Sequence, residues 1–338
     1  MRVKKVVAAV AVVGLTTLAA ACGSNNDKAA EQPASTPVAT DAASAEPSDS
    51  ASPDATSDSS AEPSADLAGG DWAPPPSEGW KLVWSDEFNG TSLDPAWETR
   101  LAGQRFGRRV CAVSADNLVK VSGGTASLQV VKDDSRTPNV TKDCPNGQYL
   151  NSMIGTDQTK KFLYGTFAAR IKYDPHEGEH GAFWMQAVPA ANYTRADPKT
   201  QGVEIDVAEY FGDTFADADG TTSSFIHYEK KNGRGEIVPG RAGGYQKSLH
   251  QILGGKLPSD GYNVYSVTWT PKEYIFRVNG QETFRTSTAV SGVPEFLVLS
   301  LLTSDWELPK FDGVPLPTNM HVDWVRVWQD SDSPAGGA

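Results

Sequence analysis

Basic residues are in the minority in this sequence of 338 residues. It contains 30 Lys and Arg against 42 Asp and Glu, which gives a formal net charge of −12. Nine acids and one lysine lie between Gly23 and Gly70, so this segment alone contributes −8 of that total. The acidity therefore says little about the rest of the chain, and nothing in the charge balance favours nucleic acid as a partner.

Aromatic residues are absent before Trp72. The segment 22–70 consists mainly of Ala, Ser, Pro, Asp, Glu and Thr. Such a composition cannot bury enough apolar surface to offset the entropy lost on ordering. We therefore expect 22–70 to be a disordered tether and 331–338 to be a flexible tail. The remaining segment, 71–330, is long enough for one large all-β domain.

Long hydrophobic runs are also missing. The most apolar run, Val6–Ala21, is shorter than the ~20 residues that a membrane-spanning helix needs. It follows a basic start, so we predict that residues 1–21 are an export signal. The small residues before Cys22 resemble a bacterial lipoprotein processing site, although Leu is commoner where Ala19 stands. In that resemblance Cys22 is lipidated and is the membrane contact of an extracellular protein. Ordinary cleavage after Ala21, giving a fully secreted protein, is the alternative.

Cysteine is scarce, with three in the whole chain. Cys111 and Cys144 are the two that fall in the predicted domain, and export would allow them to form a disulfide. Two unpaired thiols are the alternative.

No helical period extends beyond a turn or two, and no internal repeat is present. Short β-rich runs recur instead between turn signals, for example YGTFAARIKY, GAFWMQAV, NVYSVTWT and YIFRVNG. Asn279-Gly280 suits a hairpin turn because both residues tolerate positive φ. Many antiparallel strands at short spacing predict a sandwich of two sheets, and a curved inner sheet that carries acids would form a cleft for a polymer.

The segment GVEIDVAEYFG places Glu204, Asp206 and Glu209 inside an apolar strand. Alternation puts Glu204 and Asp206 on one face, but it would send Glu209 to the apolar face, where an ionised carboxylate is costly. One extra residue, a β-bulge near Val207 or Ala208, restores the register. The core face would then carry Val203, Ile205, Val207 and Tyr210.

Three acids on one face have a direct chemical use. A retaining glycosidase needs two carboxyl groups about 5–5.5 Å apart, one ionised for attack and one protonated for departure. Clustering raises the pKa of at least one of them, which keeps a proton available near neutral pH. The spacing alone leaves both catalysis and calcium binding open.

The sequence resembles glycoside hydrolase family 16, in the form with the bulged Glu-x-Asp-x-x-Glu strand. The resemblance rests on motifs in order between Leu82 and Gln329: LVWSDEFNGTSLDPAW, YGTFAARIKY, GAFWMQ, EIDVAE, YSVTWT with FRVNGQ, and HVDWVRVWQ. It implies a β-jelly roll and retaining, endo-acting hydrolysis of a β-linked polysaccharide, with no cofactor required for catalysis. It also implies that Glu204 is the nucleophile, Asp206 its charge-tuning neighbour and Glu209 the general acid/base. We expect a monomer.

Other residues have roles that the resemblance suggests. Trp184, His227 and Trp306 are candidate sugar contacts, and each has a purely structural alternative. Glu87 and Asp323 are candidate ligands of a structural calcium ion, with the backbone carbonyl of Gly124; a solvated acid pair is the alternative.

The sequence also departs from the family. Many β-1,3-glucan hydrolases of this type have Trp-Pro where this chain has His180-Gly181, and a Trp shortly before the first catalytic Glu, where this chain reads KTQGVE. Both changes remove stacking surface. β-1,3-Glucan stays the first expected substrate and a galactan-type polymer the second. A carbohydrate-binding surface lipoprotein without catalysis is a further alternative, which the intact acid triplet disfavours.

The lipoprotein hypothesis predicts that metabolic labelling with a fatty acid marks the wild-type protein, because the lipid is attached at Cys22. Cys22→Ala should abolish the label. A label of equal intensity on the variant would refute the anchor at this residue.

Overall fold

The computed structural model describes residues 72–74, 79–107, 109–214, 221–246, 248–311 and 313–330. The predicted export signal 1–21, Cys22, the tether 22–70 and the tail 331–338 lie outside these residues. Among the helices of the described part, none has the length and apolar character to span a bilayer.

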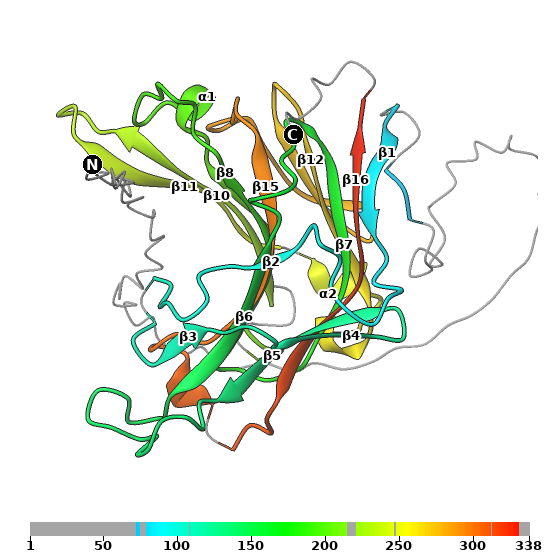
Figure 1. Cartoon of the computed structure of the whole chain (residues 1–338). Coiled ribbons are helices and arrows are strands. Elements are labelled where there is room, and N and C mark those ends of the chain that lie inside the picture. Colours follow the sequence, from blue (N-terminus) through cyan, green and yellow to red (C-terminus); the bar gives the residue numbers. More distant parts are fainter. Residues whose placement is uncertain are drawn as a thin grey trace, which may run out of the picture. The chain divides into compact units, whose positions relative to one another are not determined.

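The described residues fold as two layers of antiparallel strands (Figure 1). The first layer contains β1 (Lys81–Asp86), β4 (Val119–Ser122), β5 (Thr125–Lys132), β7 (Gly165–Tyr173), β12 (Asn263–Trp269), β13 (Tyr274–Val278), β14 (Gln281–Thr286) and β16 (Thr318–Gln329). The second contains β2 (Glu98–Thr99), β6 (Tyr149–Gly155), β8 (His180–Ala187), β9 (Glu204–Tyr210), β10 (Thr222–Lys231), β11 (Ile237–Tyr245) and β15 (Glu295–Leu302). The predicted jelly-roll sandwich is confirmed.

The two layers join where β5 pairs with β6. The strand β3 (Ala112–Ser114) runs parallel to β6, and the other pairings between named strands are antiparallel. The helices are short: α1 (Pro198–Gln201), α2 (Leu249–Ile252) and the 3-10 turns Pro258–Asp260 and Leu308–Lys310.

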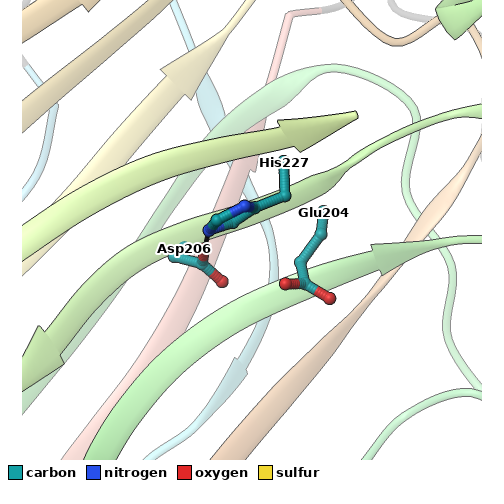
Figure 2. A group of neighbouring side chains, drawn as sticks. All are labelled: Glu204, Asp206 and His227. Atoms are coloured by element: carbon teal, nitrogen blue, oxygen red, sulfur yellow. Dashed lines mark ion pairs between the residues drawn. The ribbon is translucent and has the colours of Figure 1, made fainter. Parts of the chain in front are cut away.

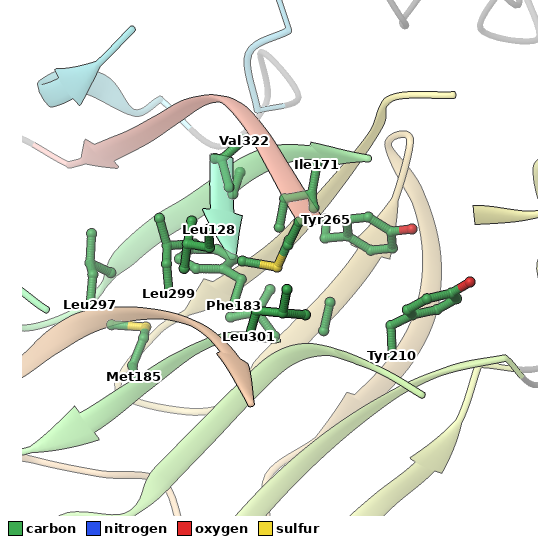
Figure 3. Packing of buried hydrophobic residues seen from close by; sticks show 14 of the residues in the cluster. Leu128, Ile171, Phe183, Met185, Tyr210, Tyr265, Leu297, Leu299, Leu301 and Val322 are labelled. Atoms are coloured by element: carbon green, nitrogen blue, oxygen red, sulfur yellow. The ribbon is translucent and has the colours of Figure 1, made fainter. Parts of the chain in front are cut away.

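The main core lies between the layers (Figure 3). Alternate residues of β8 and β15, including Phe183, Met185 and Leu299, meet Leu128 and Val322 of the first layer. Phe183 is completely buried, so truncating it to Ala would cost about 3–5 kcal/mol of stability. This side of the second layer is apolar because alternation directs the opposite set of side chains, the acids among them, to its other face.

A smaller apolar cluster covers part of that other face. Its buried members are Met153, Ala182, Trp184, Phe296, Val298 and Leu302. They come from β6, β8 and β15, so these strands are apolar on both faces. The polar side chains are concentrated on the neighbouring strands, β9 and β10.

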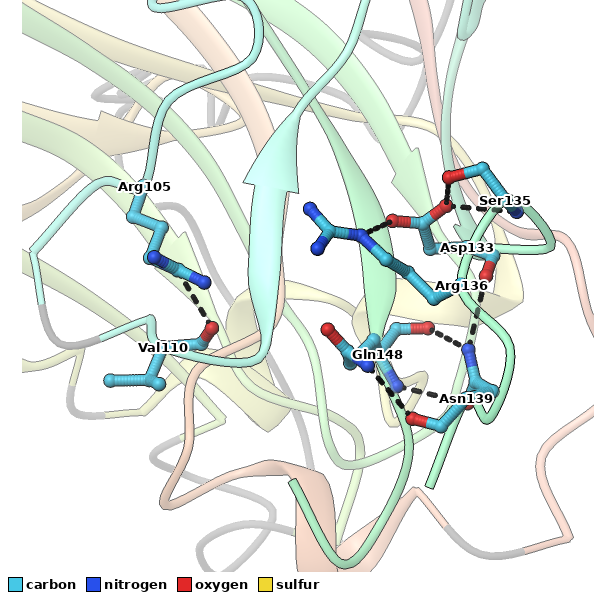
Figure 4. Close-up of polar contacts among 7 residues, drawn as sticks. All are labelled: Arg105, Val110, Asp133, Ser135, Arg136, Asn139 and Gln148. Carbon is cyan, nitrogen blue, oxygen red and sulfur yellow. Dashed lines mark hydrogen bonds and ion pairs between the residues drawn. The ribbon is translucent and has the colours of Figure 1, made fainter. Parts of the chain in front are cut away.

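A disulfide joins Cys111 to Cys144, with the Cα atoms 5.4 Å apart. It ties the segment before β3 to the long loop between β5 and β6. Hydrogen bonds from a side chain also stabilise the loop between β5 and β6. Asn139 Nδ2 donates to the carbonyl oxygens of Asp133 and Gln148 at 3.1 and 3.0 Å (Figure 4). The disulfide therefore ties the two segments to each other, and Asn139 joins the two ends of the loop.

The fully buried side chain of Glu295 makes stability depend on pH. Burial raises the pKa of Glu295 from 4.5 to about 8, although hydrogen bonds with Ser291 and the backbone of Val203 lower it in part. Burial likewise raises the pKa of Glu179 to about 8. The unfolded chain releases these protons near pH 4.5 and the folded chain only near pH 8, so the free energy of unfolding should fall as the pH rises between these values.

Glu295→Gln should make that fall shallower, by up to about 1.4 kcal/mol per pH unit for one proton. Chemical denaturation at several pH values measures the slope. The same change at the exposed Glu98 should leave the slope as in wild type. Equal slopes in Glu295→Gln and wild type would contradict the assignment of this proton to Glu295.

Candidate active site

The acid-bearing strand β9 contains the predicted bulge. Opposite β8, Ala208 pairs with Phe183 and Asp206 with Trp184, which are adjacent on β8, so Val207 is the extra residue. The pairing with β10 is irregular at the same place, between Ser223 and Phe225. The bulge confirms the sequence interpretation and lies at one of the two residues predicted for it.

The bulge sorts the side chains as expected. The residues Val203, Ile205, Val207 and Tyr210 lie in the main core, together with Ala208. Glu209 pairs with Ala182 and Asp206 with Trp184, and both partners lie in the smaller cluster on the opposite face. Asp206 and Glu209 are 4% and 7% exposed. The acids therefore share one face; Asp206 and Glu209 are buried there, and Glu204 is partly buried.

His227 joins this group from the neighbouring strand β10, where it pairs with Glu204. Its Nε2 atom lies 3.3 Å from Oδ2 of Asp206, and one oxygen each of Glu204 and Asp206 and one ring nitrogen of His227 lie within 4.8 Å of one another (Figure 2). The structure thus brings His227 beside the acids, in agreement with its place in the sequence pattern. That spacing could also hold a metal ion.

Glu209 has partners of its own. Nε2 of His180, the first residue of β8, lies 2.9 Å from Oε1 of Glu209. Ser223 Oγ donates to Oε2 of Glu209 at 3.5 Å. The sequence analysis treated His180 only as a departure from the family, and the structure makes it a direct neighbour of the predicted acid/base.

Arg100 supplies positive charge on the side of Glu204. Its Nη2 donates to Oε1 of Gln186 at 3.0 Å, and its Nε lies 3.3 Å from Oδ1 of Asp157. The guanidinium lies over the ring of Phe296, 4.7 Å from the ring centre. Gln186 is the cross-strand neighbour of Glu204, so Arg100 is held close to that carboxylate.

Burial and these neighbours set the pKa values of the two glutamates. Burial and the charge of Glu209 raise the pKa of Glu204 to about 8, while Arg100 lowers it in part. Burial also raises the pKa of Glu209, but the charge and hydrogen bond of His180, with the charge of His227, outweigh it and hold that pKa below its ordinary value. Their different neighbours therefore shift the pKa values of the two glutamates in opposite directions.

The three candidate sugar contacts have different environments. Trp184 lies on the acid-bearing face but is only 5% exposed. Phe106 packs on the Trp184 ring, and Nε1 of Trp184 donates a hydrogen bond to Ser300 Oγ at 3.1 Å. These contacts favour the core alternative for Trp184, and its role as a sugar contact stays a prediction. Trp306, in contrast, is 45% exposed, and its ring lies 5.7 Å from that of Phe211.

The contacts of Glu87 and Asp323 do not fit the predicted calcium site. Both oxygens of Glu87 accept hydrogen bonds of 2.9 Å from Arg326. Oδ2 of Asp323 accepts one of 2.7 Å from Arg170. An arginine already balances each carboxylate, and a calcium ion would have to displace it.

Sequence reasoning missed Arg100 and the role of His180. Arg100 reaches Gln186 across 86 positions of the chain, and no motif around it has a spacing that marks a site. One signal could have identified His180. Strand alternation puts it on the same face of β8 as Trp184, and β8 was the strand expected beside the acids.

Comparison with known proteins agrees with this geometry. The family model described as glycosyl hydrolases family 16 matches residues 108–326, more than half of the chain. Among curated proteins, the chain is 25% identical over 297 residues to glucan endo-1,3-beta-glucosidase A1 of Niallia circulans, covering 78% of this chain and 40% of that protein. It is 25% identical over 261 residues to keratan-sulfate endo-1,4-beta-galactosidase of Sphingobacterium multivorum, covering 74% of this chain and 55% of that protein. The chain thus spans about half of the length of these relatives.

Solved structures show the same fold. The laminarinase catalytic domain from Thermotoga maritima superimposes with a TM-score of 0.54 at 20% identity, covering 75% of this chain and 99% of that one. At this identity the similarity is evidence for the fold alone.

Proposed function

The chain belongs to the glycosyl hydrolases of family 16, and from that premise we propose that it is a retaining, endo-acting hydrolase of a β-linked polysaccharide. One observation carries the proposal: the bulge at Val207 brings Glu204, Asp206 and Glu209 to one face, where Asp206 and Glu209 are buried and Glu204 is partly buried. A binding module has no use for the mutual repulsion of three carboxylates. The enzyme is therefore favoured over a carbohydrate-binding lipoprotein.

In the first step, an oxygen of ionised Glu204 attacks the anomeric carbon of the sugar. The bond to the leaving oxygen breaks, and protonated Glu209 gives its proton to that oxygen. In the second step, Glu209 takes a proton from water, the water oxygen bonds to the anomeric carbon, and the ester bond to Glu204 breaks. Two inversions give net retention, and both carboxyl groups return to their starting states.

The reactive form of the site has an ionised Glu204 and a protonated Glu209. Arg100 favours the ionised form of Glu204. Asp206, which lies between the two glutamates on β9 and beside His227, can share a proton with the nucleophile and restrain it.

For the substrate we propose β-1,3-glucan first and a galactan-type polymer second. The relative from Niallia circulans, an endo-1,3-beta-glucosidase by name, supports the first, and the endo-1,4-beta-galactosidase supports the second. The exposed ring of Trp306 is the candidate stacking surface, which continues through Phe211 to His180. We also propose, from the sequence alone, that the enzyme acts outside the cell and is anchored through Cys22.

Substitution of the two glutamates separates their roles. Glu204→Gln removes the attacking charge, so release of reducing ends from laminarin or galactan should fall by several orders of magnitude. Glu209→Ala should lose about a hundredfold or more on the polymer, because no proton reaches the leaving oxygen. With an aryl glycoside that has a good leaving group, azide should restore turnover of Glu209→Ala and give the β-azide.

The exposed Glu282 of β14 provides the matched control, and Glu282→Gln should keep the wild-type rate. Hydrolysis of the polymer by Glu204→Gln at the wild-type rate would show that β9 is not the catalytic strand. A wild-type protein that cleaves neither polymer would contradict the proposed substrates.

A further inference from the structure

The contact between His180 and Glu209 is a built feature of the site. The two side chains are 14% and 9% exposed, and the distance of 2.9 Å between Nε2 and Oε1 is within ion-pair range. The imidazole ring stacks on Phe211, with the ring centres 4.2 Å apart and the planes 23° apart. Ala182, the residue opposite Glu209 on β8, is small and leaves room for this contact.

Charged groups surround the imidazole on several elements. Glu209 lies on β9, and Glu307, just before the 3-10 turn Leu308–Lys310, interacts with the charge of His180. On β10, His227 in its protonated form favours the ionised form of Glu209, but burial lowers the pKa of His227 and so disfavours its charge. Glu179 precedes His180 in the chain and is almost fully buried. His180 thus lies among carboxylates, and Glu209 is the one it touches.

We propose that His180 is a positioning residue that holds Oε1 of Glu209 and favours the ionised form of this carboxylate. The inference rests on the function proposed above, in which Glu209 is first an acid and then a base. His180 stands where many β-1,3-glucan hydrolases have the Trp of a Trp-Pro pair, so this departure from the family would have a role in the site.

The contact affects the two half-reactions in opposite ways. The first step needs Glu209 protonated, and a lowered pKa means that this form is lost at a lower pH. The second step needs Glu209 ionised to accept a proton from water, and a lowered pKa makes this form available at a lower pH. His180 donates no net proton in either step. It should therefore shift the whole activity profile toward acid pH and favour hydrolysis of the covalent intermediate.

His180→Phe tests the proposal, because phenylalanine keeps a ring against Phe211 but has no ring nitrogen to contact Oε1 of Glu209 and cannot carry a positive charge. The direct readout is the carboxyl carbon signal of Glu209 in protein labelled with 13C-glutamate, identified by its disappearance in Glu209→Gln. We expect this signal to titrate at a higher pH in His180→Phe than in wild type. His321→Phe, a change in the first layer beside Ser127, is the matched control and should leave the titration unchanged.

Kinetics provide a second readout. On the polymer that wild type cleaves, the alkaline limb of kcat/KM should move to higher pH in His180→Phe. The maximal kcat/KM should stay within about tenfold, well short of the loss expected when the acid/base itself is removed. On an aryl glycoside whose second step limits turnover, the acid limb of kcat should move to higher pH as well. His180→Gln should shift the limbs in the same direction and replaces His180→Phe in both measurements if the latter does not fold.

The outcomes separate this inference from the proposed function. If no polymer is cleaved by wild type but Glu209 titrates higher in the variant, the proposed function fails and the contact between His180 and Glu209 stands. If the titration of Glu209 is the same in wild type and in both His180 variants, the inference is overturned, whatever the activity.

Discussion

Successive side chains of a regular strand point to opposite faces of the sheet, and three carboxylates on one face at positions 204, 206 and 209 do not fit that alternation. The extra residue at Val207 removes the conflict: it lets Val207 and Ala208 both lie in the core while Glu209 returns to the face of Glu204 and Asp206. Without it, either Glu209 or the residues after it would face the wrong side. The sandwich holds this arrangement in place. The core behind β9 fixes the strand, and the neighbouring strands β8 and β10 provide the side chains that contact the acids.

Three carboxylates close together in a site with little water repel one another, and this repulsion is an electrostatic cost. The side chains around each carboxylate determine which of them is more easily ionised. Arg100 lies near Glu204 from the segment after β2, His227 approaches Asp206 from β10, and His180 binds Glu209 from β8. Each acid therefore has a different cationic or ionisable neighbour. That difference is what allows chemically identical glutamates to have different proton affinities, as two-step catalysis requires.

The sequence predicted what depends on local pattern. The bulge, the shared face of the acids and the all-β sandwich follow from alternation, which acts over a few residues. The pairing of His180 with Glu209 and the place of Arg100 depend on which strands become neighbours, and no local pattern encodes that. Trp184 shows a further limit: alternation gave its face correctly, but the cover from Phe106 comes from a loop that has no period. The contacts of the predicted calcium ligands could not be foreseen for a similar reason, because Arg170 and Arg326 are far in the sequence from Asp323 and Glu87.

The most direct test of the account is to trap the covalent intermediate. A 2-fluoro glycoside of the accepted sugar, with a good leaving group, forms the ester with the nucleophile but slows its hydrolysis, so the site can be identified by peptide mass mapping. The account predicts one sugar per protein, attached to Glu204 in the peptide that contains the bulge. Attachment to Glu209, or to any carboxylate outside β9, would contradict it.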